Sequence, residues 1–249
     1  MAMIDVHNHI LPGVDDGAQD MASALEMARI LCAFGFDTIA ASPHLGMGPG
    51  GDVCPKQAEE VRAELREALE AEGLDLKLLP NSEHHVTPEL FERMHENKVV
   101  GVGGSSKWLL VELPWLPITN VADVLFRIRA KGFKLLLAHP ERYKYLTVKE
   151  GEALVEQGLR LQLDLGSFVG LYGQRAQQKV LEYMALDLGH VLGTDLHQPE
   201  DAKVWLSDAF KMIKTKWGEE VLDMGFSTNP RYLIADEDSD SLVGLRRSM

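Results

Sequence analysis

The chain has 249 residues, of which 45% are hydrophobic and 25% charged, a composition typical of a folded domain rather than a disordered chain. Its formal net charge of −13 disfavours nucleic acid as a partner, because an acidic surface repels phosphate backbones. The same acidity is compatible with binding cations. The length suits one large domain, and α/β barrels often have this size.

Membrane insertion and secretion are not indicated by the sequence. The N-terminal residues lack the basic and apolar segments of a signal peptide, and no run reaches the ~18 apolar residues of a membrane span. Cys32 and Cys54 are the two cysteines, too few for a disulfide framework. We therefore expect a cytoplasmic protein with no direct membrane insertion, and one disulfide remains open as a minor alternative.

Short strand-like runs alternate with amphipathic helical patterns along the whole chain. The expected strands are residues 3–7, 37–44, 76–85, 107–114, 133–140, 159–166 and 190–197. The expected helices are residues 19–33, 55–73, 87–96, 120–132, 148–158, 174–189 and 201–218. A polar tail from about residue 235 is expected to be loosely held.

Strictly alternating strands and helices imply a parallel sheet in an α/β fold. About seven such units favour one closed or nearly closed barrel over residues 1–249, with an open doubly wound sheet as the second choice. Neither a GxGxxG turn after the first strand nor a phosphate-binding loop is present, so no nucleotide fingerprint supports the open sheet.

The segment IDVHNHI at residues 4–10 carries two histidines one residue apart. In a strand, residues i and i+2 point the same way, so His7 and His9 would share a face with Asp5. Two imidazoles on one face can close on a single metal ion. One His-x-His pair is weak evidence alone, so the other ligands must come from elsewhere in the chain.

Further histidines and carboxylates follow the other expected strands, at the end where α/β barrels build their active sites. Any one of them could be an ordinary loop residue, and Asp16 could cap the next helix. However, Glu112 and His139 directly follow apolar runs, and burying a charge without a partner costs several kcal/mol. A metal cluster would supply that partner. The strand-end residues are His7, His9, Asp15, Asp16, His44, Glu83, Glu112, His139, Asp195 and His197.

Mixed imidazole and carboxylate ligands suit Mn, Fe or Zn, and the absence of a thiolate ligand argues against a structural zinc site. The number of candidate ligands exceeds the number that one ion can bind. We therefore expect two or three divalent ions with bridging carboxylates. His84 and His85 could line the rim without binding metal. His95 and His190 are interpreted as surface or core residues.

The segments IDVHNHILPGVDDG, SPH, SEHHVTP, LLVELP, AHPERY and GTDLH together resemble the polymerase and histidinol phosphatase (PHP) superfamily. More narrowly, they resemble the bacterial manganese-dependent protein-tyrosine phosphatases of capsule and exopolysaccharide clusters. The resemblance covers residues 4 to about 233. It implies a distorted (β/α)7 TIM-like barrel with a three-metal site, preferably Mn²⁺. The implied ligands are His7, His9, Asp16, His44, Glu83, Glu112, His139, Asp195 and His197.

The resemblance also implies a reaction, the hydrolysis of phosphotyrosine on the tail of a bacterial tyrosine autokinase that governs polysaccharide export. Arg142 matches an arginine expected to hold the phosphate. Metal-activated hydroxide would attack phosphorus, and His44 or a metal-bound water could serve as the acid. The Cys-x5-Arg signature of cysteine-dependent phosphatases is absent, since Thr38 and Glu60 occupy the sixth positions after the two cysteines.

Two departures from the family pattern concern positive charge. The family often has a basic run after the histidine that corresponds to His44, whereas this chain reads HLGMGPGG there. The family also often has an arginine a few residues after the last histidine, whereas this chain has only Lys203. A histidinol-phosphate phosphatase or other small phosphomonoesterase is the main alternative. A nuclease, an amidohydrolase and a non-catalytic metal-binding regulatory module rank lower. Assembly into a homo-oligomer is left open.

Overall fold

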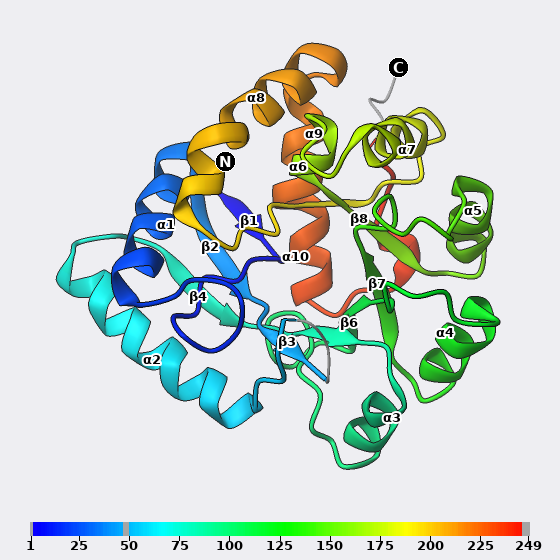
Figure 1. Ribbon diagram of the computed structural model, residues 1–249, viewed down its shortest axis with the longest axis horizontal. Helices are drawn as coiled ribbons and strands as arrows, with labels where there is room; N and C mark the ends of the chain where they lie inside the picture. The colour runs from blue at the N-terminus through cyan, green and yellow to red at the C-terminus, as the bar shows by residue number, and fades with distance from the viewer. Residues whose placement is uncertain (1, 47–49, 246–249) are drawn as a thin grey trace.

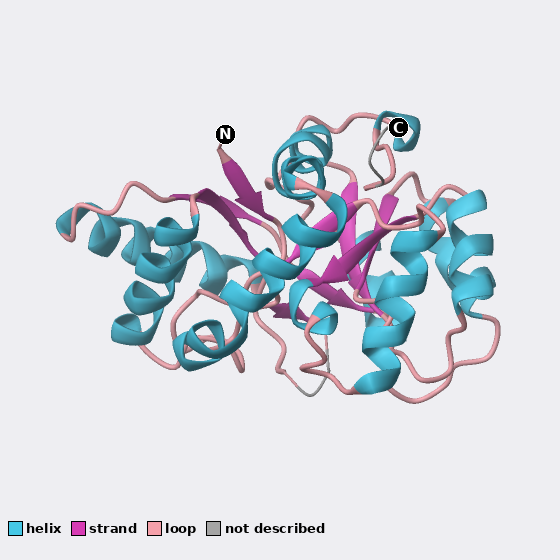
Figure 2. Ribbon diagram, turned by 90° about the horizontal axis from the view of Figure 1, so that it is seen from above, coloured by secondary structure: helices cyan, strands magenta, loops and turns pink. Residues whose placement is uncertain are grey.

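The computed structural model describes residues 2–46 and 50–245 (Figure 1). Parallel strands form the centre of the molecule and helices surround them, as both views show (Figures 1 and 2). The strands are β1 Met3–Asp5, β2 Phe36–Ala41, β3 His44–Leu45, β4 Lys77–Pro80, β5 Glu83–His85, β6 Trp108–Glu112, β7 Lys134–Ala138, β8 Arg160–Asp164 and β9 Val191–Gly193.

The helices match the expected order, with additional short elements near the C-terminus. The long ones are α1 Met21–Phe34, α2 Pro55–Ala71, α3 Pro88–His95, α4 Val121–Arg129, α5 Val148–Glu156, α7 Gln174–Ala185 and α8 Pro199–Trp217. The short ones are α6 Leu165–Phe168, α9 Glu219–Asp223, the π-helix Met224–Thr228, α10 Asn229–Ile234 and the 3-10 turn Ser239–Ser241. None of the helices within residues 2–46 and 50–245 is long and apolar enough to span a bilayer.

The strands form a distorted (β/α)7 barrel, as predicted. They lie in two parallel sheets, ordered β1-β2-β4 and β3-β5-β6-β7-β8-β9. The chain passes directly from β2 to β3 and from β4 to β5, so these four strands amount to two long, broken ones. A bridge between Asn8 and Leu196 joins the start of the barrel to its end. The nine strands within residues 2–46 and 50–245 therefore correspond to the seven expected units.

The two interruptions correct the predicted continuous strands 37–44 and 76–85. Pro43 separates β2 from β3 because proline has no N–H for the ladder. Pro80 ends β4, and the Asn81 side chain instead donates a hydrogen bond to the Val6 carbonyl at 2.8 Å. Each interruption lets a strand change sheets, which distorts the barrel just below the rim that carries His44 and Glu83.

Residues on alternate positions of each strand fill the barrel or face the helices. In β6 and β7, Leu110, Leu136 and Ala138 join the inner core, whereas Leu109 and Leu137 belong to the larger outer core beneath the helices. All five side chains are completely buried. The continuous apolar runs of these strands thus result from burial on both faces, which is typical of parallel sheets.

Local capping interactions set the starts of two helices. Asp20 caps α1 by accepting a hydrogen bond from the Ser23 amide at 2.8 Å, so Asp16 is not the capping residue. Thr147 and Glu150 form a reciprocal capping box at the start of α5. Asp16 remains available to the rim.

The segment after α10 packs across the amino-terminal end of the barrel. Trp108 Nε1 donates to the Glu237 carbonyl at 2.9 Å, and Arg160 Nε donates to the Ser239 carbonyl at 2.9 Å. Leu242 and Leu245 are buried. The tail from about residue 235 was expected to be loosely held, but it is packed as far as residue 245. Residues 246–249 lie outside the described part of the chain.

Candidate metal centre and active site

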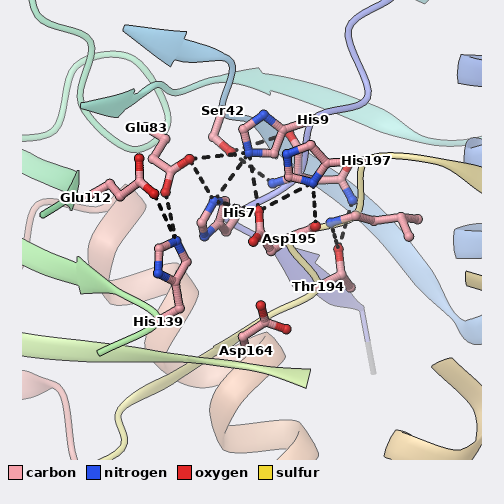
Figure 3. A network of polar contacts seen from close by, with 12 residues as sticks. His7, His9, Ser42, Glu83, Glu112, His139, Asp164, Thr194, Asp195 and His197 are labelled. Atoms are coloured by element: carbon pink, nitrogen blue, oxygen red, sulfur yellow. Dashed lines mark hydrogen bonds and ion pairs between the residues drawn. The ribbon is translucent and has the colours of Figure 1, made fainter. Parts of the chain in front are cut away.

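The carboxyl ends of the strands surround a cavity of about 180 Å³. Histidines and carboxylates from both ends of the chain point toward one another at this rim (Figure 3). The residues that line the cavity are Asp16, His44, Gly50, Glu83, Glu112, Trp115, His139, Arg142, Asp195 and His197. This is the rim on which the sequence analysis placed the active site.

The innermost group of side chains with the geometry to hold a metal ion consists of His7, His9, Glu83 and Asp195. His7 Nε2 lies 3.3 Å from Glu83 Oε2 and 3.1 Å from Asp195 Oδ1. The corresponding distances from His9 Nε2 are 3.4 Å and 3.3 Å. Four ligand atoms from three parts of the chain thus converge on one point.

Hydrogen bonds on the far side of each ring orient these two imidazoles. The Nδ1 of His7 lies 2.8 Å from Gln162 Oε1, and the Nδ1 of His9 lies 2.9 Å from Asp15 Oδ2. Both partners accept, so we assign the protons to the Nδ1 atoms and leave the Nε2 lone pairs directed at the cavity. This support of metal-binding histidines by outer carboxylates and amides recurs in metal sites.

The strand argument for His7 and His9 was incorrect in detail, because β1 ends at Asp5 before either histidine. The two histidines flank Asn8, which forms a parallel bridge with Leu196, and His9 N donates to the Leu196 carbonyl at 3.1 Å. Asp5 does not join the ligand groups. Its side chain accepts from Thr194 Oγ1 at 2.5 Å and so ties the first strand to the last.

A second group consists of His9, Asp16, His44 and His197. Asp16 Oδ1 lies 3.3 Å from His44 Nε2 and 3.4 Å from His197 Nε2. The rings of His9 and His197 stack with their centroids 4.1 Å apart. The Asp16 side chain is 50% exposed, so this group is nearest to solvent.

Glu83 and Glu112 extend the ligand set toward His44 and His139. His44, Glu83 and Glu112 form a third group. The Nε2 of His139 lies 3.0 Å from Glu83 Oε1 and 3.9 Å from Glu112 Oε1. His85 Nδ1 lies 2.7 Å from Glu112 Oε2, so His85 supports a carboxylate from outside the cluster.

Two of these residues have left-handed backbone conformations. The φ angles of His139 and Asp195 are 33° and 48°. Such conformations are unfavourable for residues other than glycine and are concentrated at functional sites. The surrounding barrel thus holds both side chains in place at a cost in backbone energy.

The charges within the cluster balance only if a cation is present. Burial lowers the pKa of His7, but the carboxylates Glu83 and Asp195 outweigh it and raise that pKa well above its ordinary value. Burial raises the pKa of Asp195, but His7 and His197 hold it well below its usual range. Without a metal ion, these shifts favour the protonated form of His7 and the ionised form of Asp195. These hard and borderline donors fit divalent ions such as manganese, iron or zinc.

Arg142 is the cation at the edge of the cavity. Its Nη1 donates to Asp195 and, at 3.3 Å, to Asp164 Oδ2. The guanidinium carbon lies 5.1 Å from the ring centroid of Trp115 and 4.0 Å from that of Tyr172. Two carboxylates and two aromatic rings thus fix the guanidinium beside the ligand cluster.

All nine predicted ligands reach this rim, whereas Lys203 and His84 do not line the cavity. The Lys203 ammonium pairs with Glu26 at 3.0 Å. His84 bonds to the Leu110 carbonyl at 2.9 Å and accepts from the Val100 amide, so it has a structural role. Part of the non-basic segment after His44, residues 47–49, lies outside the described residues.

Comparison with known proteins agrees with this site. Residues 3–235 match a protein family described as capsular polysaccharide synthesis, CpsB/CapC. The chain belongs to this family. Tyrosine-protein phosphatase YwqE of Bacillus subtilis, a relative, is 30% identical over 88% of this chain and 87% of its own length. Tyrosine-protein phosphatase CpsB of Streptococcus pneumoniae is 25% identical over 94% of this chain and 99% of its own.

Two solved structures have the fold of this CpsB/CapC chain. A structure from work on YwqE and CpsB, described there as metal-dependent tyrosine phosphatases, superposes with a TM-score of 0.84 and 29% identity. It covers 94% of this chain and 95% of its own. A histidinol phosphate phosphatase from Lactococcus lactis shares the fold, with a TM-score of 0.54 and 11% identity. The match covers 86% of this chain and 93% of that protein's chain.

Proposed function

We propose that this CpsB/CapC chain is a metal-dependent protein-tyrosine phosphatase. The observation that carries the proposal is the convergence of imidazoles and carboxylates on one cavity beside a fixed arginine. Relatives with this overall fold and similar length are named as tyrosine phosphatases. We take the nine converging residues as the metal ligands and Arg142 as the phosphate-binding residue.

The bound ions, when present, would supply an activated water and neutralise charge on the phosphoryl oxygens. Glu83 lies in two of the three ligand groups, so it is the candidate bridging carboxylate. Gln162 and Asp15 hold the His7 and His9 rings with their lone pairs toward the cavity. These residues preorganise the site without touching substrate.

Arg142 would bind the equatorial oxygens of the phosphoryl group, where charge must be stabilised during transfer. The hydrogen bonds to Asp164 and Asp195 both come from Nη1. The other nitrogens of the guanidinium therefore remain as donors for the phosphate. The phenolate of tyrosine, with an ordinary pKa near 10, leaves with modest help. For His44, which lines the cavity, the roles of metal ligand and proton donor exclude each other, because an imidazole binds metal only in its unprotonated form, and we assign it as a ligand.

Finer assignments follow from the same proposal. We propose Mn²⁺ as the resident ion, in two or three copies, because mixed nitrogen and oxygen ligands suit it. The phosphoprotein would be a bacterial tyrosine autokinase of polysaccharide synthesis, consistent with the description of the matching family. Kinases of this kind use cytoplasmic ATP, so the phosphatase would act in the cytoplasm.

A substrate comparison tests the proposal. Initial rates of the manganese-loaded chain are measured with a phosphotyrosine peptide, a phosphoserine peptide and histidinol phosphate. We expect the phosphotyrosine peptide to have the highest kcat/KM. Preference for histidinol phosphate would replace the proposed substrate, and no turnover of any of the three with metal bound would favour a regulatory metal-binding module.

A further inference from the structure

Trp115 differs in character from every other side chain at the metal cavity. Among the described residues that line it, Trp115 is the single apolar side chain, while the rest are ionisable or glycine. It is 43% exposed. An indole kept at the mouth of a charged cavity exposes apolar surface to water, and such exposure often marks a binding contact.

The Trp115 ring is held in place from below. It stacks on His139 with centroids 5.9 Å apart and an interplanar angle of 7°, and it lies over the Arg142 guanidinium. Tyr145 Oη donates to the carbonyl of the preceding Pro114 at 2.5 Å. One part of the indole thus contacts the metal and phosphate-binding residues, and the exposed part is left at the mouth.

The size of the cavity determines where a phosphorylated side chain would lie. At about 180 Å³, it is smaller than the ~300–1,000 Å³ of pockets that enclose whole organic ligands, and the ions must share it. A phosphoryl group fits inside between the ligands and Arg142. The group that carries the phosphate would then lie at the mouth, which Trp115 lines on one side.

We propose that Trp115 is a specificity-determining residue, which stacks on the aromatic ring of the phosphorylated side chain and so selects aryl over alkyl phosphates. This inference rests on the proposed phosphatase function and names the substrate contact within it. Offset stacking between aromatic rings contributes enough to change affinity by about fivefold to tenfold. A phosphoserine or a small alkyl phosphate would gain nothing from the indole.

Non-hydrolysable ligands test the contact separately from turnover. The manganese-loaded protein is titrated by calorimetry with phenylphosphonate, which carries a ring, and with methylphosphonate, which does not. We expect the wild type to prefer phenylphosphonate by about fivefold to tenfold. Trp115→Ala should lose most of that preference and leave methylphosphonate affinity within about twofold. Trp115→Phe should retain part of the preference.

The neighbouring Leu116 is a matched control, because it is 79% exposed and does not line the cavity. Leu116→Ala should keep the wild-type preference. An unchanged preference in Trp115→Ala would overturn the inference. Equal weakening of both ligands would also overturn it, because Trp115 would then act only through Arg142. Failure of the wild type to hydrolyse phosphotyrosine would count against the proposed function. The calorimetry is independent of that result, because it measures ligand binding and not turnover.

Discussion

The Nε2 atoms of His7 and His9 lie 3.4 Å apart, and the acceptors beside their Nδ1 atoms assign a proton to each Nδ1 in the neutral rings. Two nitrogen lone pairs therefore face each other inside a buried cluster that also contains Glu83 and Asp195. This arrangement is favourable only around a cation, either a shared proton or a metal ion. The predictions below follow from that geometry.

Metal binding should stabilise the fold strongly. A ligand that binds only the folded protein at 100 times its Kd adds about 2.7 kcal/mol, which corresponds to about 5–10 °C in Tm for a chain of this size. We expect that chelation lowers Tm by about this amount and that Mn²⁺ restores it. Thermal unfolding of stripped and reloaded protein measures the shift, and Tm values insensitive to chelation would argue against a resident ion.

The metal-induced gain in Tm should grow with pH. In the metal-free protein, His7 and His9 have pKa values raised above the ordinary value of about 6.5. The stability that results is fully present below about pH 6.5 and is lost as the pH rises through the raised pKa values. Metal binding instead requires the unprotonated imidazoles. Melting curves with and without Mn²⁺ between about pH 5.5 and 8.5 test this, and a gain that shrinks toward high pH would be inconsistent with it.

Gln162→Leu should weaken metal binding although Gln162 is no ligand. The variant removes the acceptor that bonds His7 Nδ1 at 2.8 Å, and loss of such outer partners typically costs about 10–100-fold in metal affinity or activity. Competition with a chromophoric chelator measures the affinity. Gln178→Leu, an exposed position on α7, is the matched control and should bind metal like the wild type.

Arg142→Lys should lower kcat by about 10²–10³-fold, the usual effect of removing one oriented donor from a charge-stabilising site. Lysine retains the charge but lacks the planar fork that contacts carboxylates and phosphate together. Metal content, measured by elemental analysis, should stay unchanged. Arg175→Lys on α7 is the surface control, and wild-type kcat in Arg142→Lys would remove Arg142 from the proposed mechanism.

Thiol alkylation should leave activity intact. Cys54 is exposed and Cys32 is partly buried, and both are free and outside the residues lining the cavity. Iodoacetamide should therefore modify Cys54, as mass spectrometry can verify, with no loss of phosphotyrosine hydrolysis. Inactivation in step with modification would instead indicate a cysteine nucleophile.

The rule that barrel active sites lie at the carboxyl ends of strands made the rim predictable from sequence. Glu112 and His139 directly follow apolar runs, and the cost of burying a charge there without a partner already indicated a metal site. The choice of Asp16 over Asp15 came from the family resemblance. The structure places Asp16 beside His44 and His197, while Asp15 supports His9.

Other features depend on contacts between distant segments, which periodicity does not reveal. Gln162 alternates with Arg160 and Asp164 as a polar residue of β8, and only the closed barrel places it against His7. Trp115 looks like an ordinary loop residue until the fold puts it over Arg142. The strand breaks at Pro43 and after Pro80 were visible as prolines, but the change of sheet that follows depends on tertiary pairing.

The most direct test of the account is a manganese titration of chelator-stripped protein, with phosphotyrosine-peptide hydrolysis as the readout. Glu83→Gln, which removes the charge of the candidate bridging carboxylate, is measured alongside. We predict no activity without metal, a rise to a plateau at two or three equivalents, and little activity in Glu83→Gln at any concentration. Full activity in the stripped protein, or a wild-type titration curve in Glu83→Gln, would contradict the account.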